Sequence, residues 1–401
     1  MTRTLYVGLD HRYICRTVHA LPRIIEQASA EFDAFGPGYN GINNEERLAE
    51  KIYKFAPDVI VCSDFFLIYG DQLRQRSYGA SIGLFLYRLR RFTNYKFTDK
   101  ELGIWISCVE TLLEKNYKPK LVVTALETDW YKLNEAEIQL LRSADYIAGY
   151  GSEFMARIED LPDLASEKWG MEANNNMLTL MQEMKSKTIC LLDFAQNETF
   201  CRRAHSLRGS EWCIPGVKYN SRRIATEKIR KQKCRYKHKR SLISRILFMP
   251  LLPRCIRGYG LDLYNKSFDN TIQGSKYAYT CGSALRYPVT KMFEIPSAKT
   301  LLVCDPFINC ENAGYRHMEN YISSNSEAIN YWIDWCRQNW ERAEEIATRG
   351  YQLVLESHSE TARVNQLRMC LDAIAEGVFC GSSWKNGTYI LYSHQSDNEH
   401  G

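Results

Sequence analysis

The chain has 401 residues, 45% of them hydrophobic and 25% charged, with a formal net charge of +5. These fractions are ordinary for a soluble globular protein, and no apolar run approaches the ~18 residues of a membrane span. A chain of this length can bury large cores, so two domains are the natural expectation.

The fourteen cysteines contain no CxxC pair and no spacing typical of zinc ligands. Three of them, Cys62, Cys190 and Cys304, lie inside apolar runs that read as strands. We expect these thiols to be buried and reduced, as in cytoplasmic proteins. The N-terminus also leads directly into an apolar strand without a signal-peptide core. Both features predict a cytoplasmic location.

The first half of the chain alternates apolar strand runs with helical segments. Strands are expected at residues 4–9, 32–35, 58–62, 121–124, 146–148 and 188–192. Helices are expected at residues 17–31 and 44–54, and in the aromatic- and arginine-rich stretch 70–118. Repeated alternation of this kind predicts a parallel, doubly wound sheet.

The second half restarts the same pattern. Strands are expected at residues 211–215, 276–280 and 300–304, and helices at 221–233, 289–297, 332–349 and 359–375. We therefore predict an N-terminal Rossmann-like domain over residues 1–205, a C-terminal one over 206–380, and a polar tail over 381–401. Ligands bind at the carboxyl ends of strands in such sheets.

The segment Ser275–Phe307 carries the strongest functional pattern, which reads strand, polar turn, helix, strand. A helix that starts after Pro288 presents free backbone N–H groups and a positive dipole end beside the turn. Lys291 and Glu294 lie three residues apart and so share one helical face. A cation and a carboxylate beside such a helix end suit a phosphate and a ribose hydroxyl.

Two further turns carry residues suited to phosphate. Ser283, Arg286 and Tyr287 precede the helix, and together with backbone N–H groups they could hold a pyrophosphate. Gly216 begins the strand-to-helix turn of the second half and Arg222 follows it, which suits contact with a phosphate. A simple polar loop is the alternative for both turns.

Acidic side chains follow strand ends in the first half. A side chain at such a position can act as a general base that deprotonates a bound hydroxyl. Our candidates for catalysis are Asp10, His11 and Asp64, and Glu127 and Asp129 occupy similar positions. Each is alternatively a helix cap or a loop carboxylate.

The order of these motifs resembles the C-terminal half of GT-B glycosyltransferases, in particular the CgeB/YkvP-like, group 1-like members. Those chains carry a Lys-x-x-Glu unit, then small residues and an apolar strand, which here are Lys291–Ala298 and Thr300–Cys304. One departure is Lys299, which stands where the family usually has glycine or another small residue.

Further matches follow along the chain, and the resemblance covers about residues 259–374. An aromatic residue follows a glycine at Gly314-Tyr315. A closing pattern of an alanine helix, a glycine, a His-Ser pair and an arginine ends with His358 and Arg363, for which we expect a structural role.

The resemblance implies the GT-B fold, an α/β architecture of two Rossmann-like domains whose parallel sheets face a central cleft. It implies that Glu294 accepts hydrogen bonds from the nucleotide ribose. The second domain would bind a UDP-, GDP- or other nucleoside diphosphate sugar, and the first a glycan, glycolipid or protein acceptor. Since the chain has no D-x-D triplet, lysine, arginine and a helix dipole would replace a metal ion. We expect no metal and no cofactor besides the sugar donor.

Two alternatives to this function stay open, and so does the choice between inversion and retention of the sugar's configuration. One is a glycosyltransferase that acts on modified DNA bases, and the other is a non-catalytic GT-B-like binding protein, because fold does not fix function.

Positive charge is concentrated in residues 218–257, which hold fourteen lysines and arginines and one acid, Glu227. This segment therefore carries +13, and the rest of the chain −8. Three interpretations fit: a solvated helix with an apolar side toward the core, peripheral contact with an anionic membrane, or contact with nucleic-acid phosphates. Nucleic acid is the weakest fit of the three.

Overall fold

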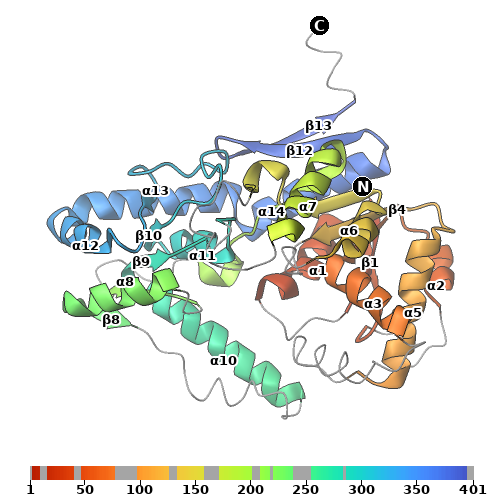
Figure 1. Cartoon of the computed structure of the whole chain (residues 1–401), viewed down its shortest axis with the longest axis horizontal. Helices are drawn as coiled ribbons and strands as arrows, with labels where there is room; N and C mark the ends of the chain where they lie inside the picture. The colour runs from red at the N-terminus through yellow and green to blue at the C-terminus, as the bar shows by residue number, and fades with distance from the viewer. Residues whose placement is uncertain are drawn as a thin grey trace, which may run out of the picture.

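The structure is a computed structural model. It describes residues 2–9, 16–39, 47–76, 97–125, 133–157, 171–200, 208–216, 220–237, 254–282 and 286–394. The described residues build two α/β units, each around its own parallel sheet, and the two units lie side by side (Figure 1).

The first sheet has six strands in the order β2-β1-β3-β4-β5-β6, and all neighbours are parallel. The strands are β1 (Arg3–Val7), β2 (Glu31–Phe35), β3 (Val59–Ser63), β4 (Lys120–Ala125), β5 (Tyr146–Gly149) and β6 (Thr188–Cys190). Each expected strand of this half is confirmed. All five residues of β3 are buried, because helices cover both faces of a parallel sheet and require a continuous apolar run.

The first unit contains six α-helices among its described residues. They are α1 (Arg16–Ala28), α2 (Leu48–Phe55), α3 (Asp64–Arg76), α5 (Asp99–Glu114), α6 (Glu135–Arg142) and α7 (Met171–Glu183). Capping boxes fix the starts of α5 and α6: the N-cap side chains of Thr98 and Asn134 each accept from the backbone three residues on, and a glutamate there reaches back.

The second sheet has five parallel strands in the order β11-β10-β9-β7-β8. They are β7 (Ser210–Cys213), β8 (Tyr236–Lys237), β9 (Ser275–Thr280), β10 (Leu301–Cys304) and β11 (Ile322–Ser323). The three strands expected in this half are confirmed. Lys299 precedes β10 with a φ of 56°, so the helix-to-strand turn keeps a left-handed residue, although lysine rather than glycine supplies it.

Five described helices follow or flank these strands: α8 (Asn220–Lys231), α10 (Arg254–Gln273), α11 (Thr290–Ser297), α12 (Ile329–Gln338) and α13 (Trp340–Ser357). The single helix expected over 332–349 is wrong, because the chain breaks at Asn339 and forms two helices. The φ and ψ of Asn339, −123° and 45°, are not helical. Helix α10 was not expected.

The C-terminal segment returns to the first unit. Helix α14 (Glu360–Ala375) packs against α1, and β12 (Phe379–Lys385) packs against β6. Figure 1 shows these elements, in dark blue, over the N-terminal unit. The expected polar tail is wrong for residues 381–394, since β12 pairs with β13 (Thr388–Ser393) in an antiparallel hairpin. Burial of Trp384, 2% exposed, anchors that hairpin.

Both sheets have apolar side chains packed on their two faces. Cys62, Cys190 and Cys304 are buried free thiols, as predicted. None of the described helices is long and apolar enough to span a membrane.

Candidate functional site

The candidate donor site lies where the strand order of the second sheet reverses, between β7 and β9. In parallel sheets a ligand crevice forms at such a point, outside the carboxyl ends of the strands. Gly216 follows β7 with a φ of 99°. A methyl group at Gly216 would lie 2.4 Å from Lys291 Cε and 2.7 Å from Arg222 Nη1. The fold thus brings together residues that the sequence analysis selected from two separate segments, the turn and helix start after β7 and helix α11.

Arg222 forms the base of this site. It is 3% exposed, and its Nη2 donates to Thr280 Oγ1 at 2.9 Å and to the Cys281 carbonyl at 3.2 Å. Arg222 thereby ties the first turn of α8 to the end of β9. Its buried charge lies directly beside the Gly216 backbone, where an anion would be favoured.

Helix α11 carries Lys291 and Glu294. It begins at Thr290, one residue later than expected. Lys291, its second residue, is partly buried, and its ammonium lies 5.9 Å from the Phe268 ring centroid. Glu294 is 4% exposed. Lys291 lies in the first turn, at the positive end of α11, and Glu294 lies one turn further along the helix.

The turn before α11 is described in part. Arg286 has a φ of 50°, and its carbonyl accepts from the Ile308 backbone N–H at 2.9 Å. The Tyr287 ring lies 5.8 Å from that of Tyr150, which follows β5 in the first unit. Ser283 lies outside the described residues. Tyr287 therefore lies at the boundary between the two units.

On the first unit, Asp64 follows β3 and begins α3. It lies where the order of the first sheet reverses, between β1 and β3. It is 1% exposed, and its Oδ1 accepts from the Phe65 backbone N–H at 2.9 Å. The other acidic and histidine candidates, Asp10, His11, Glu127 and Asp129, lie outside the described residues.

A polar contact joining the two units was not anticipated. Asp193, just beyond β6, accepts a hydrogen bond from the Thr290 hydroxyl of α11 at 2.7 Å. The Tyr150 hydroxyl also hydrogen-bonds to the Asp193 carboxylate. The signal in the sequence was the carboxylate at the end of the apolar run TICLLD, which resembles an ordinary helix cap.

Asp193 is electrostatically unusual. It is 8% exposed. Burial raises the pKa of its carboxyl above the ordinary value, although hydrogen bonds from Thr290 and Tyr150 and the charges of Arg363 and Lys291 oppose that rise. This carboxyl thus lies within the electric field of Lys291, at the edge of the candidate donor site.

His358 and Arg363 occupy the buried return from the second unit to the first. The His358 Nε2 lies 2.7 Å from the Ala313 carbonyl, and its ring stacks on Trp384 at 4.6 Å. Burial, reinforced by Arg363, lowers the pKa of His358 to about 3. Arg363 donates to the Asp193 carbonyl at 3.0 Å. These contacts bind the two units together.

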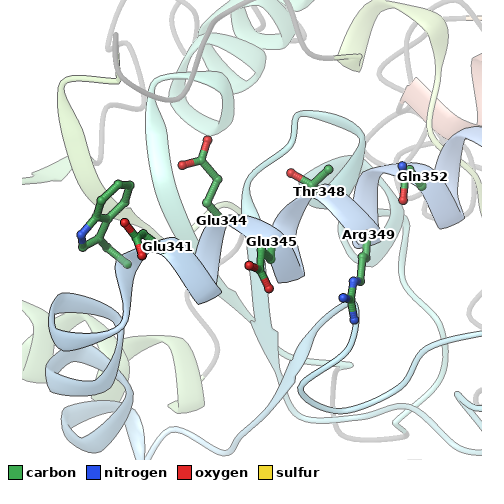
Figure 2. Close-up of a pocket in the computed structure, with 7 residues that line it drawn as sticks. Glu341, Glu344, Glu345, Thr348, Arg349 and Gln352 are labelled. Carbon is green, nitrogen blue, oxygen red and sulfur yellow. The ribbon is translucent and has the colours of Figure 1, made fainter.

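A groove of about 500 Å³ runs along α13, apart from the candidate donor site. Figure 2 shows its side chains, including Glu341, Glu344 and Glu345, projecting from one helix. The lining carries three carboxylates and one guanidinium, that of Arg349, so its net charge is negative and disfavours a diphosphate. This groove is therefore a poorer candidate for a phosphate-bearing ligand than the site at Gly216, Arg222 and Lys291.

Comparison with known proteins identifies the fold. No family model matches the sequence, and no curated protein matches it. Among solved structures, Anabaena Alr3699/HepE in complex with UDP and glucose matches at 10% identity with a TM-score of 0.50, covering 93% of this chain and 100% of its own. Sucrose-phosphate synthase from Thermosynechococcus elongatus matches at 9% identity with a TM-score of 0.50, covering 94% and 100%. The chain has the GT-B fold, as predicted.

Proposed function

We propose that this protein is a glycosyltransferase that uses a nucleotide-activated sugar. The observation that carries the proposal is that Gly216, Arg222 and Lys291 meet where the strand order of the second sheet reverses. Two cations and the N-terminal end of α11 suit a diphosphate. The solved structures of the same fold support this, since one of them contains UDP and glucose.

Each residue of the site in the second unit would contact a different part of the donor. Lys291 would neutralise the diphosphate, and the absence of a side chain at Gly216 lets the backbone and the ligand approach closely. Arg222 would stabilise the departing nucleotide from beneath, while Glu294 would accept hydrogen bonds from ribose hydroxyls. Ser283, Arg286 and Tyr287 would complete the pyrophosphate contacts from the turn before α11.

The first unit would bind the acceptor, which we propose to be a glycan, glycolipid or protein. Asp64, where the strand order of the first sheet reverses, is the described candidate for the general base, and Asp10 and His11 are the further candidates from the sequence. Closure of the two units would exclude water, so that the sugar is transferred to the acceptor and the donor is not hydrolysed. The domain division at residues 205/206 and membership of the CgeB/YkvP-like family belong to the same proposal.

Peripheral contact with an anionic membrane through residues 218–257 remains part of the proposal. The observation that favours it is the exposure of Arg223, Arg230 and Lys231 along α8. Vesicles containing anionic lipid should then co-sediment with the protein, and binding should weaken as salt is raised.

The donor site is tested by calorimetry with UDP, GDP, CMP and dTDP and their sugars. One nucleotide should bind, and ligand at about 100 times its Kd should add roughly 2.7 kcal/mol to the unfolding free energy. Lys291→Ala and Glu294→Gln should weaken that binding. Glu319→Gln, an equal charge change at an exposed site, should leave it unchanged. Absence of binding by all four nucleotides would favour the non-catalytic alternative.

A further inference from the structure

A second groove lies where the chain crosses between the two units, with a volume of about 510 Å³. We call it the hinge groove. The lining residues that matter here are Asn197, Phe200, Tyr351, Glu356, Thr361 and Asn365. Asn197 and Phe200 come from the segment after β6 where the chain first crosses between the units. The others come from α13 and from α14.

Both crossings of the chain border the hinge groove. The Ala195 N–H donates to the His358 carbonyl at 2.9 Å, and the Glu360 N–H donates to the Ala195 carbonyl at 3.0 Å. The two crossings therefore run as a hydrogen-bonded pair. Any ligand in the groove touches segments that belong to both.

The hinge groove is separate from the candidate donor site. Gln273, two residues before β9, donates to the Phe200 carbonyl at 3.5 Å. The Lys299 ammonium, just before β10, lies 5.9 Å from the Tyr351 ring centroid. Both contacts are at the amino ends of strands, whereas Gly216 and Lys291 lie at the carboxyl ends.

Two aromatic rings form adjacent walls of the groove. The centroids of Phe200 and Tyr351 are 6.0 Å apart, and the ring planes are inclined by 77°. Leu355, 46% exposed, extends the apolar surface. An occupant is thus offered apolar faces in two directions.

Polar side chains surround these rings. Asn197, Glu356, Thr361 and Asn365 make no side-chain hydrogen bond or ion pair with any residue in the described part of the chain. Two amides, a carboxylate and a hydroxyl supply both donors and acceptors. Ligand hydroxyls could satisfy all of these groups.

The charge of the lining decides the class of ligand. Glu356 is the one charged side chain among the described lining residues, so anions such as phosphates are disfavoured. A sugar ring combines apolar C–H faces with many hydroxyls, which matches rings bordered by amides. The volume is within the ~300–1,000 Å³ typical of small-molecule sites. We propose that the hinge groove binds a neutral oligosaccharide.

The test uses the full-length chain and three fluorescently labelled probes, maltotetraose, cellotetraose and chitotetraose, with binding followed by fluorescence polarisation. At least one probe should bind. Tyr351→Ala and Asn365→Ala should each weaken that binding by about tenfold or more. Tyr331→Ala removes a tyrosine 61% exposed on α12, outside the groove, and should leave binding unchanged.

Saturating UDP should not displace the probe, because the two sites are separate. Displacement by UDP, or unchanged affinity in both groove variants, would overturn the proposal. So would a lack of binding by all three probes at about 10 mM. The proposed activity fails separately, since a chain that binds no nucleotide could still bind the probes at the hinge groove.

Discussion

Replacing Gly216 by alanine tests the candidate donor site most directly. The backbone φ of 99° is strained for any side chain, at about 1–2 kcal/mol. The new methyl would also lie 2.7 Å from Nη1 of the buried Arg222 guanidinium, whose other nitrogen, Nη2, donates to Thr280 and Cys281. Disturbing those hydrogen bonds adds about 1–3 kcal/mol. We expect an unfolding free energy lower by roughly 2–4 kcal/mol in urea titrations.

A matched control separates strain from collision. Gly377 has a φ of 74°, and a methyl there would meet nothing within 4 Å. Gly377→Ala should therefore cost only the backbone strain, about 1–2 kcal/mol. Equal destabilisation by the two alanines would show that the contacts with Lys291 and Arg222 do not matter.

Gly216→Ala should also reduce nucleotide affinity. The methyl would lie 2.4 Å from Lys291 Cε, so this side chain must move away from the site. Losing one charge-assisted hydrogen bond of about 1.5–3 kcal/mol weakens binding roughly 10- to 150-fold. Calorimetry with the nucleotide that binds the wild type measures the change. An unaltered Kd in Gly216→Ala, beside an unaltered Kd in Gly377→Ala, would refute the assignment of the site.

Three further changes have definite expected outcomes. Asp193→Asn removes a carboxyl whose folded pKa lies above its ordinary value of 3.8. Stability from a raised pKa is present at low pH and lost as pH rises through the folded pKa. The unfolding free energy of the variant should therefore rise relative to that of wild type as pH increases from about 4, and a difference that stays constant with pH would contradict this. The pKa of His358 is lowered from 6.5 to about 3. Wild type should therefore lose stability as pH falls from about 6.5 to about 3. The unfolding free energy of His358→Phe, measured by urea titration, should depend less on pH over this range. Arg208→Lys breaks the planar fork that donates to the carbonyls of Ser275 at 2.8 Å and Ala298 at 2.7 Å; we expect a loss of roughly 2–4 kcal/mol, and an unchanged melting temperature would count against it.

Local patterns in the sequence predicted most of the elements correctly. The run Val59–Ser63 could be recognised as a strand because both faces of a parallel sheet are covered, which requires consecutive apolar residues. The expectations failed where a distant partner decides the structure. Trp384 and the hairpin around it looked like a polar tail, since the strand that buries it, β6, lies about 190 residues earlier.

The same division holds for the candidate site. Lys291 and Glu294 were predictable as a pair because a spacing of three residues places two side chains on the same face of a helix. Asp193 was missed, because a carboxylate after a strand is usually a cap. Its role depends on Thr290 of the other unit, which no local pattern reveals.

By itself, the sequence predicted the alternation of strands and helices and the residues suited to phosphate and ribose. These features depend on periodicity and spacing over a few residues. The GT-B architecture was implied by the resemblance of the motifs to that family. Only the tertiary structure decided that Gly216, Arg222 and Lys291 meet at one point. It also decided that Asp193 joins the two units and that the end of the chain returns to the first sheet. Such contacts depend on the order of strands in the sheets, which places side chains from distant segments together.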